Sequence, residues 1–476
     1  MIPLRVIKKI LIALTFSIFL ASCNKEKFTN KESEETSSTA EKLKDTIFNY
    51  DKNASAIREY IIKGDYKKIE RFIQNKGDVN LRCKGYLRAG RDIPETKHTD
   101  ENWTLLMLAI FENEIEIAQL LIKNKADINA KNAVGHTALF LACAHNYEKE
   151  AKLLLEHNAK VTDTGKDPDG MSALQWALTY DLNDVAEELI ERGADVNTYA
   201  SDIDRTILME AFFSDSIQPQ VIHKIIDAGA DLTIKTKDKE TALMFACTDN
   251  DIIAVKKILA ANTDINAESK NGQTALCYAA RNKTQDTVLL ELLVAKGAKI
   301  NTNTIYGRNA LIEAVSSGSI EKVKFLVEKG ALVNKKSEGF GGVSPLSEAV
   351  YWATHGKADE IVQYLIENKA DVNIKRDNRE SSLLVAIQSD EKYETVKLLI
   401  EKGAKVNDSD DENTTPLMKA VKYNLYKITK LLLENDAKTN ITDVYGKNIL
   451  HHAKETAERT GDDSILKLIQ SSTNKS

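Results

Sequence analysis

The sequence predicts an all-α solenoid of about twelve helix–turn–helix units with β-turn fingers between them. The first observation is the pattern Thr/Ser/Asn-x-Leu-x-x-Ala, whose alanines recur at intervals of 33 to 37 residues. An apolar segment with helical spacing follows each pattern, and a turn similar to Gly-Ala-Asp-Val-Asn closes each unit. Such a recurrence indicates a repeat architecture, in which each unit packs only against its neighbours. The recurring alanines are Ala109, Ala142, Ala177, Ala211, Ala246, Ala279, Ala314, Ala349, Ala386, Ala420 and Ala453.

The chain begins with a segment that has the organisation of a signal peptide. Residues 1–9 are short and positively charged, and residues 10–20 (ILIALTFSIFL) form an apolar run. A membrane-spanning helix needs about 20 apolar residues, so this run is too short to cross a bilayer. Its length suits the core of a signal peptide. The letters LASC follow directly and end at Cys23.

The LASC segment resembles the lipobox of bacterial lipoproteins, which has a branched apolar residue, two small residues and a cysteine. The resemblance implies that residues 1–22 are removed and that Cys23 carries a diacylglycerol on its sulfur and an acyl chain on its new amine. Acyl chains contribute about 0.8 kcal/mol per buried methylene, so two or more of them anchor a protein stably to a membrane. A plain secretory leader with an incidental cysteine and a buried apolar strand are the alternatives.

Residues 23–50 are predicted to combine the lipidated Cys23 with a disordered tether. Residues 24–45 are charged and polar and contain few apolar side chains, so they cannot bury enough surface to fold. A short solvated helix near the end of this segment is the alternative. The folded body is then expected over residues 51–476, held away from the membrane.

The residues of each predicted repeat have physical reasons. Thr415 and Pro416 place a hydroxyl at a helix N-cap and a proline at the first helical position, and Ser344-Pro345 repeats the arrangement. Alanine is small where two helices cross closely. The glycine of the turn suits the left-handed conformation that ends a helix, and asparagine tolerates the same conformation. The turn glycines are Gly193, Gly229, Gly297, Gly330 and Gly403, and the asparagines in their place are Asn158 and Asn262.

These motifs resemble the ankyrin repeat, whose unit reads Gly-x-Thr-Pro-Leu-His-x-Ala and ends in Gly-Ala-Asp-Val-Asn. The resemblance covers residues 54–470. The chief departure concerns the motif histidine, which only His451 keeps. Residues 56–80 lack the start of the pattern and residues 446–470 are more polar, so we expect them to form the two caps. Methionine replaces the histidine at Met107, Met209, Met244 and Met418.

The resemblance implies that a protein partner binds the concave face, at the variable positions just before the motif threonine and just after the motif alanine. Aromatic side chains at these positions are the predicted contacts, because exposed aromatics anchor interfaces. They are Trp103, Phe111, Tyr180, Phe213, Tyr351, Trp352 and Tyr423. The best single candidates are Trp103 and Trp352. The alternative is that several of these side chains pack against neighbouring repeats.

Three junctions between the motifs are longer than the repeat requires. Residues 81–101 lengthen the first finger and carry five basic side chains beside Tyr86. This finger suits an acidic partner or anionic headgroups, and a plain solvated loop is the alternative. Residues 335–342 are predicted to form a second flexible finger, and residues 351–357 extend a turn between helices.

Composition and motifs exclude several classes of function. The formal charge is -6, and removing the three basic residues of the leader leaves 62 basic against 71 acidic residues, or -9. Such a body has no basic footprint for nucleic acid. The sequence holds no HExxH, Walker, GxSxG or GxGxxG motif, so we expect neither an enzyme nor a cofactor. The cysteines form no CxxC pair, and we expect Cys143 and Cys247 to be buried and His451-His452 to bind no metal.

The sequence therefore favours a monomeric scaffold that binds an unknown protein partner from a bacterial membrane. Asn24 follows Cys23 where an aspartate would retain some lipoproteins in the inner membrane, which favours the outer membrane, facing either the periplasm or the exterior. One alternative is an envelope immunity or inhibitor protein that neutralises a toxin or a hydrolase. Another alternative is a lipid-anchored enzyme.

Overall fold

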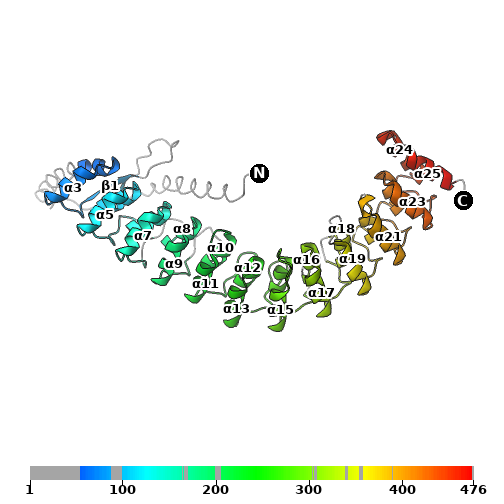
Figure 1. Ribbon diagram of the computed structural model, residues 1–476, viewed down its shortest axis with the longest axis horizontal. Coiled ribbons are helices and arrows are strands. Elements are labelled where there is room, and N and C mark those ends of the chain that lie inside the picture. Colours follow the sequence, from blue (N-terminus) through cyan, green and yellow to red (C-terminus); the bar gives the residue numbers. More distant parts are fainter. Residues whose placement is uncertain are drawn as a thin grey trace, which may run out of the picture. The chain divides into compact units, whose positions relative to one another are not determined.

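The computed structural model describes residues 54–86, 99–162, 165, 170–198, 205–302, 304, 308–337, 341–352, 358–388 and 390–473 (Figure 1). The chain divides into two compact units, Met1–Asp231 (unit 1) and Leu232–Ser476 (unit 2). Cys23, the leader and the tether lie outside the described residues, so the expectations for them stay predictions.

The described part of unit 1 begins with helical residues 54–62, so the N-terminal cap has a first helix although it lacks the start of the motif. Each later pair packs a first helix against its own second helix, and neighbouring pairs pack first helix on first helix, as α4 does on α6. The elements are α3 (Tyr66–Gln74), β1 (Arg82–Tyr86), β2 (Thr99–Thr104), α4 (Leu105–Phe111), α5 (Ile115–Lys123), α6 (Ala138–Ala144), α7 (Glu148–Glu156), α8 (Ala173–Thr179), α9 (Asn183–Glu191), α10 (Ile207–Phe213) and α11 (Pro219–Asp227).

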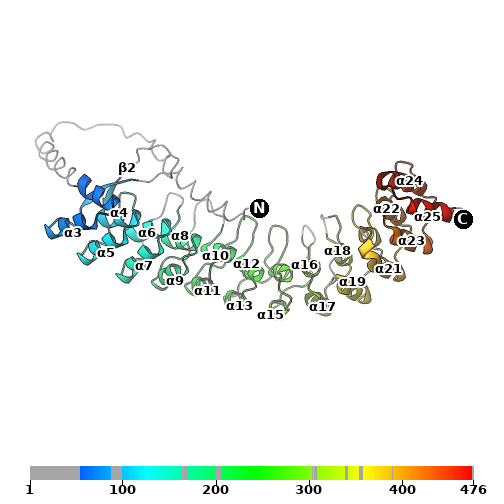
Figure 2. The ribbon, with the colours of Figure 1, turned by 45° about the horizontal axis from the view of Figure 1, so that its top comes forward.

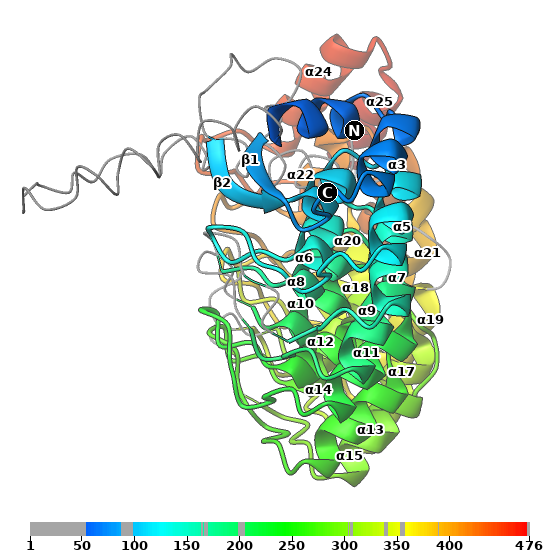
Figure 3. The same ribbon diagram turned by 90° about the vertical axis from the view of Figure 1, so that its left-hand side faces the viewer.

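Unit 2 continues the same arrangement and ends in a longer pair of helices. Its elements are α12 (Ala242–Asp249), α13 (Ile252–Ala260), α14 (Ala275–Arg281), α15 (Val288–Ala295), α16 (Ala310–Ser317), α17 (Ile320–Glu328), α18 (Pro345–Trp352), α19 (Ala358–Glu367), α20 (Ser382–Ala386), the 3₁₀ helix η2 (Asp390–Lys392), α21 (Tyr393–Glu401), α22 (Pro416–Lys422), α23 (Tyr426–Glu434), α24 (Ile449–Thr460) and α25 (Ser464–Thr473). Within each unit the first helices form one row and the second helices form another (Figure 2). The fingers project from the first helices, away from the second helices (Figure 3).

Caps, alanines and turns follow the sequence pattern. The Thr415 hydroxyl accepts a hydrogen bond from the backbone N–H of Met418, 3.3 Å away, and Pro416 starts the helix. Every motif alanine is at most 1% exposed, because the first helices of neighbouring repeats cross there. The turn glycines have φ between 86° and 94°, and Asn158 and Asn262 have φ of 62° and 55°. The predicted left-handed turn is therefore confirmed.

The last residue of the turn also links repeats, which the sequence pattern did not suggest. Asn373 accepts a hydrogen bond from the backbone N–H of Lys405 at 2.9 Å and donates to the carbonyl of Gly403 at 3.1 Å. Asn301 makes the same two bonds to Leu332 and Gly330 of its next repeat. Each such asparagine satisfies two backbone groups that the neighbouring helix end leaves open.

Two buried lysines close the ends of first helices in unit 2. Lys322, 1% exposed, donates from Nζ to the carbonyls of Ala279 and Asn282, at 3.2 and 2.9 Å, near the C-terminus of α14. Lys392 donates in the same way to the carbonyls of Val350 and Tyr351 in α18. A cation is favourable at a helix C-terminus, because the unpaired carbonyls carry partial negative charge there.

The base of the long basic finger is a hairpin rather than a plain loop. β1 and β2 pair antiparallel, with Cys83 opposite Trp103, and this is the one sheet among the described residues. Arg82 is used within the fold, since its Nη1 donates to the carbonyls of Asn102 and Lys131 at 2.8 and 2.7 Å. Residues 87–98, the predicted basic tip, lie outside the described residues.

Candidate protein-binding surface

Two of the seven predicted contact residues are buried, so the prediction is wrong for them. Trp103 on β2 is 1% exposed and Phe111 at the end of α4 is 6% exposed. Their rings meet edge to face, with centroids 5.1 Å apart, and His145 of the next repeat lies 4.9 Å from Phe111. The hairpin places Trp103 opposite Cys83 of β1, which makes both aromatics part of the core.

Three predicted contacts lie on separate repeats. Tyr180 is half-buried and stacks on Trp176 at 5.6 Å, and this burial raises the pKa of Tyr180. Phe213 is 52% exposed, and the guanidinium of Arg205 lies 4.2 Å from its ring centroid. Tyr423, just after α22, is 55% exposed.

Tyr351 and Trp352, the last residues of α18, form an exposed aromatic pair. They are 45% and 48% exposed, and their ring centroids lie 5.2 Å apart at an angle of 88°. Among the described residues, they are the only two of the seven predicted contacts that are both exposed and in ring contact with each other. Of the seven predicted contacts, this pair is therefore the best candidate for a binding site.

A row of polar side chains links successive repeats of unit 2 at the base of the fingers. In each link, the residue just before one helix N-cap contacts the residue just before the motif alanine of the next repeat. The links are Glu240–Tyr278, Gln273–Glu313, Arg308–Glu348 and Glu380–Lys419, with distances of 2.8, 2.8, 3.0 and 2.9 Å. We call this row the inter-repeat ladder.

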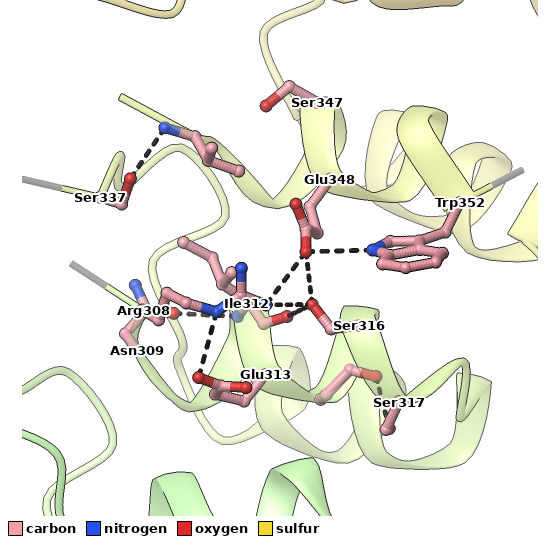
Figure 4. Close-up of polar contacts among 12 residues, drawn as sticks. Arg308, Asn309, Ile312, Glu313, Ser316, Ser317, Ser337, Ser347, Glu348 and Trp352 are labelled. Carbon is pink, nitrogen blue, oxygen red and sulfur yellow. Dashed lines mark hydrogen bonds and ion pairs between the residues drawn. The ribbon is translucent and has the colours of Figure 1, made fainter. Parts of the chain in front are cut away.

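Arg308 joins two links of the ladder, because it contacts both Glu313 and Glu348, and Glu348 in turn contacts the aromatic pair (Figure 4). Its Nε donates to Glu313 at 3.2 Å and its Nη2 donates to Glu348 at 3.0 Å. The same Glu348 oxygen accepts hydrogen bonds from the Ser316 hydroxyl at 2.6 Å and from Trp352 Nε1 at 3.1 Å. The indole of Trp352 is therefore held in place at its polar edge while much of its surface stays exposed.

Burial and neighbouring charges shift the pKa values of this cluster in opposite directions. Glu313 is 1% exposed and Glu348 is 6% exposed. Burial raises the pKa of Glu313, and the neighbouring Arg308 partly offsets this shift. Burial alone would lower the pKa of Arg308, but the two carboxylates outweigh it and raise that pKa. Arg308 is the shared partner of both carboxylates, so removing its guanidinium would leave both buried without this ion pair.

A polar cavity of about 400 Å³ opens beside Arg308 in unit 2. Residues of α14, α16 and the two finger bases line it. They are Asn271, Gln273, Arg281, Thr304, Arg308, Glu313, Ser316 and Ser317. The sequence-based predictions considered aromatic side chains and the basic finger of residues 81–101, and they missed these residues. The signal was present, since Glu313 and Glu348 each interrupt an apolar first helix directly before the motif alanine.

The cysteine prediction is confirmed, and the structure places the two histidines in different surroundings. Cys143 and Cys247 are buried as expected, and burial raises the pKa of both thiols. Of the histidine pair, His452 and not the motif histidine His451 is buried, with Nε2 3.0 Å from a carboxylate oxygen of Asp443. In the part of the chain that the structure describes, no group of three or more His, Cys, Asp or Glu residues is placed to hold a metal ion. No helix in that part is long and apolar enough to span a membrane.

The chain belongs to the ankyrin repeat family. The family model for ankyrin repeats (3 copies) matches residues 106–200, 208–304, 243–337, 346–443 and 383–474, which together cover most of the chain. This match agrees with the stacked helix pairs, the N-caps and the left-handed turns. Proteins built from these repeats typically serve as interaction scaffolds without catalytic activity of the repeats themselves.

Known proteins share these repeats at modest identity. The ankyrin repeat and KH domain-containing protein mask-1 of Caenorhabditis elegans is 26% identical over 64% of this chain, and the match spans 11% of the worm protein. A putative ankyrin repeat protein of Rickettsia felis is 26% identical over 71% of this chain and 83% of its own length. The crystal structure of the human ASB11 ankyrin repeat domain covers 48% of this chain at 24% identity, with a TM-score of 0.41.

Proposed function

We propose that the chain is an interaction scaffold, not an enzyme, and that it binds a protein partner on the surface of unit 2 formed by α16, α18 and the inter-repeat ladder. The exposed pair of Tyr351 and Trp352 beside the buried Arg308 cluster carries this proposal. Covering these rings removes apolar area from water, and aromatic anchors of this kind dominate interface energies. The hydrogen bond from Trp352 to Glu348 already orients the indole before a partner binds, so the side chain loses less conformational entropy on binding.

Site-specific photocrosslinking in intact cells tests this proposal. A photoreactive amino acid at position 351 should give a discrete adduct, and the same group at Tyr445, a 71% exposed residue of another finger, should not. Trp352→Ala should abolish the adduct from position 351, whereas Tyr426→Ala, at a residue 43% exposed, should leave it unchanged. Equal adducts from both positions, or an adduct that survives Trp352→Ala, would contradict the proposed surface.

We further propose that acyl chains on Cys23 anchor the scaffold in a bacterial envelope. The support is the charged start of the chain, the apolar run of residues 10–20 and the LASC letters that end at Cys23. Asn24 in place of aspartate favours the outer membrane, where the repeats would face the periplasm or the exterior. A clickable palmitate should label the wild type and not Cys23→Ser, and equal labelling of both would refute the anchor.

A further inference from the structure

The described residues that line the cavity beside Arg308 all have polar or charged side chains. Two of its eight lining residues are arginines and one is a glutamate, and Glu348, which is paired with Arg308, lies directly behind the lining. The other five are neutral hydrogen-bonding residues. Such a cavity offers hydrogen-bonding groups and two guanidinium groups to a small polar ligand.

Each of the two arginines has N–H groups that make no ion pair among the described residues. Arg281 is exposed, its guanidinium lies 4.7 Å from the ring centroid of Tyr278, and it forms no ion pair among the described residues. Arg308 uses Nε for Glu313 and Nη2 for Glu348, and its Nη1 makes no hydrogen bond within the described part of the chain. A guanidinium with free N–H groups binds a planar carboxylate through parallel hydrogen bonds.

Thr304 provides an independent indication of a ligand. It is 3% exposed, it lines the cavity, and its buried hydroxyl oxygen has no hydrogen-bond partner among the described residues. Buried polar atoms are nearly always paired, so an unpaired hydroxyl facing a cavity indicates a missing group. The side-chain amide of Asn271 at the rim also makes no hydrogen bond within the described residues. One carboxylate oxygen of Glu313 already accepts hydrogen bonds from both Gln273 and Arg308.

We propose that this cavity binds a carboxylate, the side chain of an aspartate or glutamate on the partner protein. This inference rests on the proposed scaffold function and adds the chemistry that the partner must present. Arg281 and Arg308 bind the carboxylate oxygens, and Thr304 donates its hydroxyl to one of them. Trp352 and Arg308 both donate to Glu348, so the cavity and the exposed indole are close to each other. The partner's acidic side chain in the cavity and an apolar partner group on Trp352 would therefore belong to one binding surface.

Binding of defined probes to the full-length chain tests the cavity directly. The probes are a blocked Gly-Glu-Gly tripeptide, its Gly-Gln-Gly counterpart and inorganic phosphate, titrated by NMR at millimolar concentration. The glutamate peptide should bind at least about 10-fold more tightly than the glutamine peptide, and Arg281→Gln should remove most of this difference. Thr304→Val should weaken binding of the glutamate peptide several-fold. The matched control is Lys283→Gln, which removes an exposed charge that does not line the cavity and should leave binding unchanged.

Three outcomes would overturn the carboxylate site. They are equal binding of the two tripeptides, unchanged binding by Arg281→Gln in a chain with wild-type circular dichroism, and phosphate binding that exceeds that of the glutamate peptide. The crosslinking experiment at position 351 separates the two proposals. An intact adduct with no discrimination between the tripeptides refutes the carboxylate site alone. Selective binding of the glutamate peptide without any adduct refutes the scaffold surface and leaves a carboxylate site.

Discussion

Replacing Trp103 with alanine should strongly destabilise the first repeats of unit 1, although Trp103 and Trp352 occupy positions of the same variable class in the sequence. Trp103 is 1% exposed and packs edge to face on Phe111, whereas Trp352 is 48% exposed. The two substitutions therefore form a matched pair that differs in burial. The comparison tests whether the tertiary structure, not the motif position, decides the role of each tryptophan.

The magnitude follows from the buried area. A large aromatic side chain buries about 150–250 Å², and about 25 cal/mol per Å² gives roughly 4–6 kcal/mol as an upper bound. Because alanine keeps Cβ and the site relaxes in part, Trp103→Ala should lower the free energy of unfolding by about 3–5 kcal/mol. Trp352→Ala loses only about half as much buried area, together with one hydrogen bond, so its cost should be about 2–3 kcal/mol.

Hydrogen exchange combined with urea unfolding measures both effects. Since the stability of a repeat array is a sum of neighbouring interfaces, the loss in Trp103→Ala should concentrate in the amides of α4 and α6. The amides of α22 and α24 serve as the internal control and should exchange as in the wild type. Equal destabilisation by the two substitutions, or a cost below about 1 kcal/mol for Trp103→Ala, would refute the assignment of Trp103 to the core.

Three further perturbations test other parts of the fold. Asn373→Ala removes two hydrogen bonds to the next repeat and should cost about 1–2 kcal/mol in urea unfolding, and an unchanged midpoint would contradict its linking role. Lys322→Met leaves helix-end carbonyls buried without a donor and should cost about 2–3 kcal/mol, with Lys324→Met as an exposed control; equal midpoints would contradict the capping role. Burial lowers the pKa of His452 despite Asp443, so the unfolded chain takes up a proton first. The last repeat should therefore lose stability as the pH falls below about 6.5, which hydrogen exchange in α24 measures, and His452→Leu should reduce this dependence. Identical pH dependence in both would exclude His452 as its cause.

Local chemistry made most of the fold predictable. The Thr415 hydroxyl, the turn glycine at Gly403 and the small Ala420 each act within a few residues of their own position, so their pattern in the chain is sufficient to place helices and turns. The hairpin at the base of the first finger was not predicted. Its strands carry Cys83 and Trp103, and their pairing depends on backbone contacts across the long finger.

The candidate site shows the opposite behaviour. Gln273 and Glu313 are 40 residues apart, and only the stacking of one repeat on the next brings them within 2.8 Å. By itself the sequence determined the repeat, its caps and its turns, because these depend on interactions between near neighbours. The tertiary structure alone decided that Trp103 is buried, that Trp352 is exposed, and that Arg308 joins two glutamates beside a cavity. Each of these depends on which side chain the adjacent repeat presents, and a periodic motif repeats the backbone positions without specifying that choice.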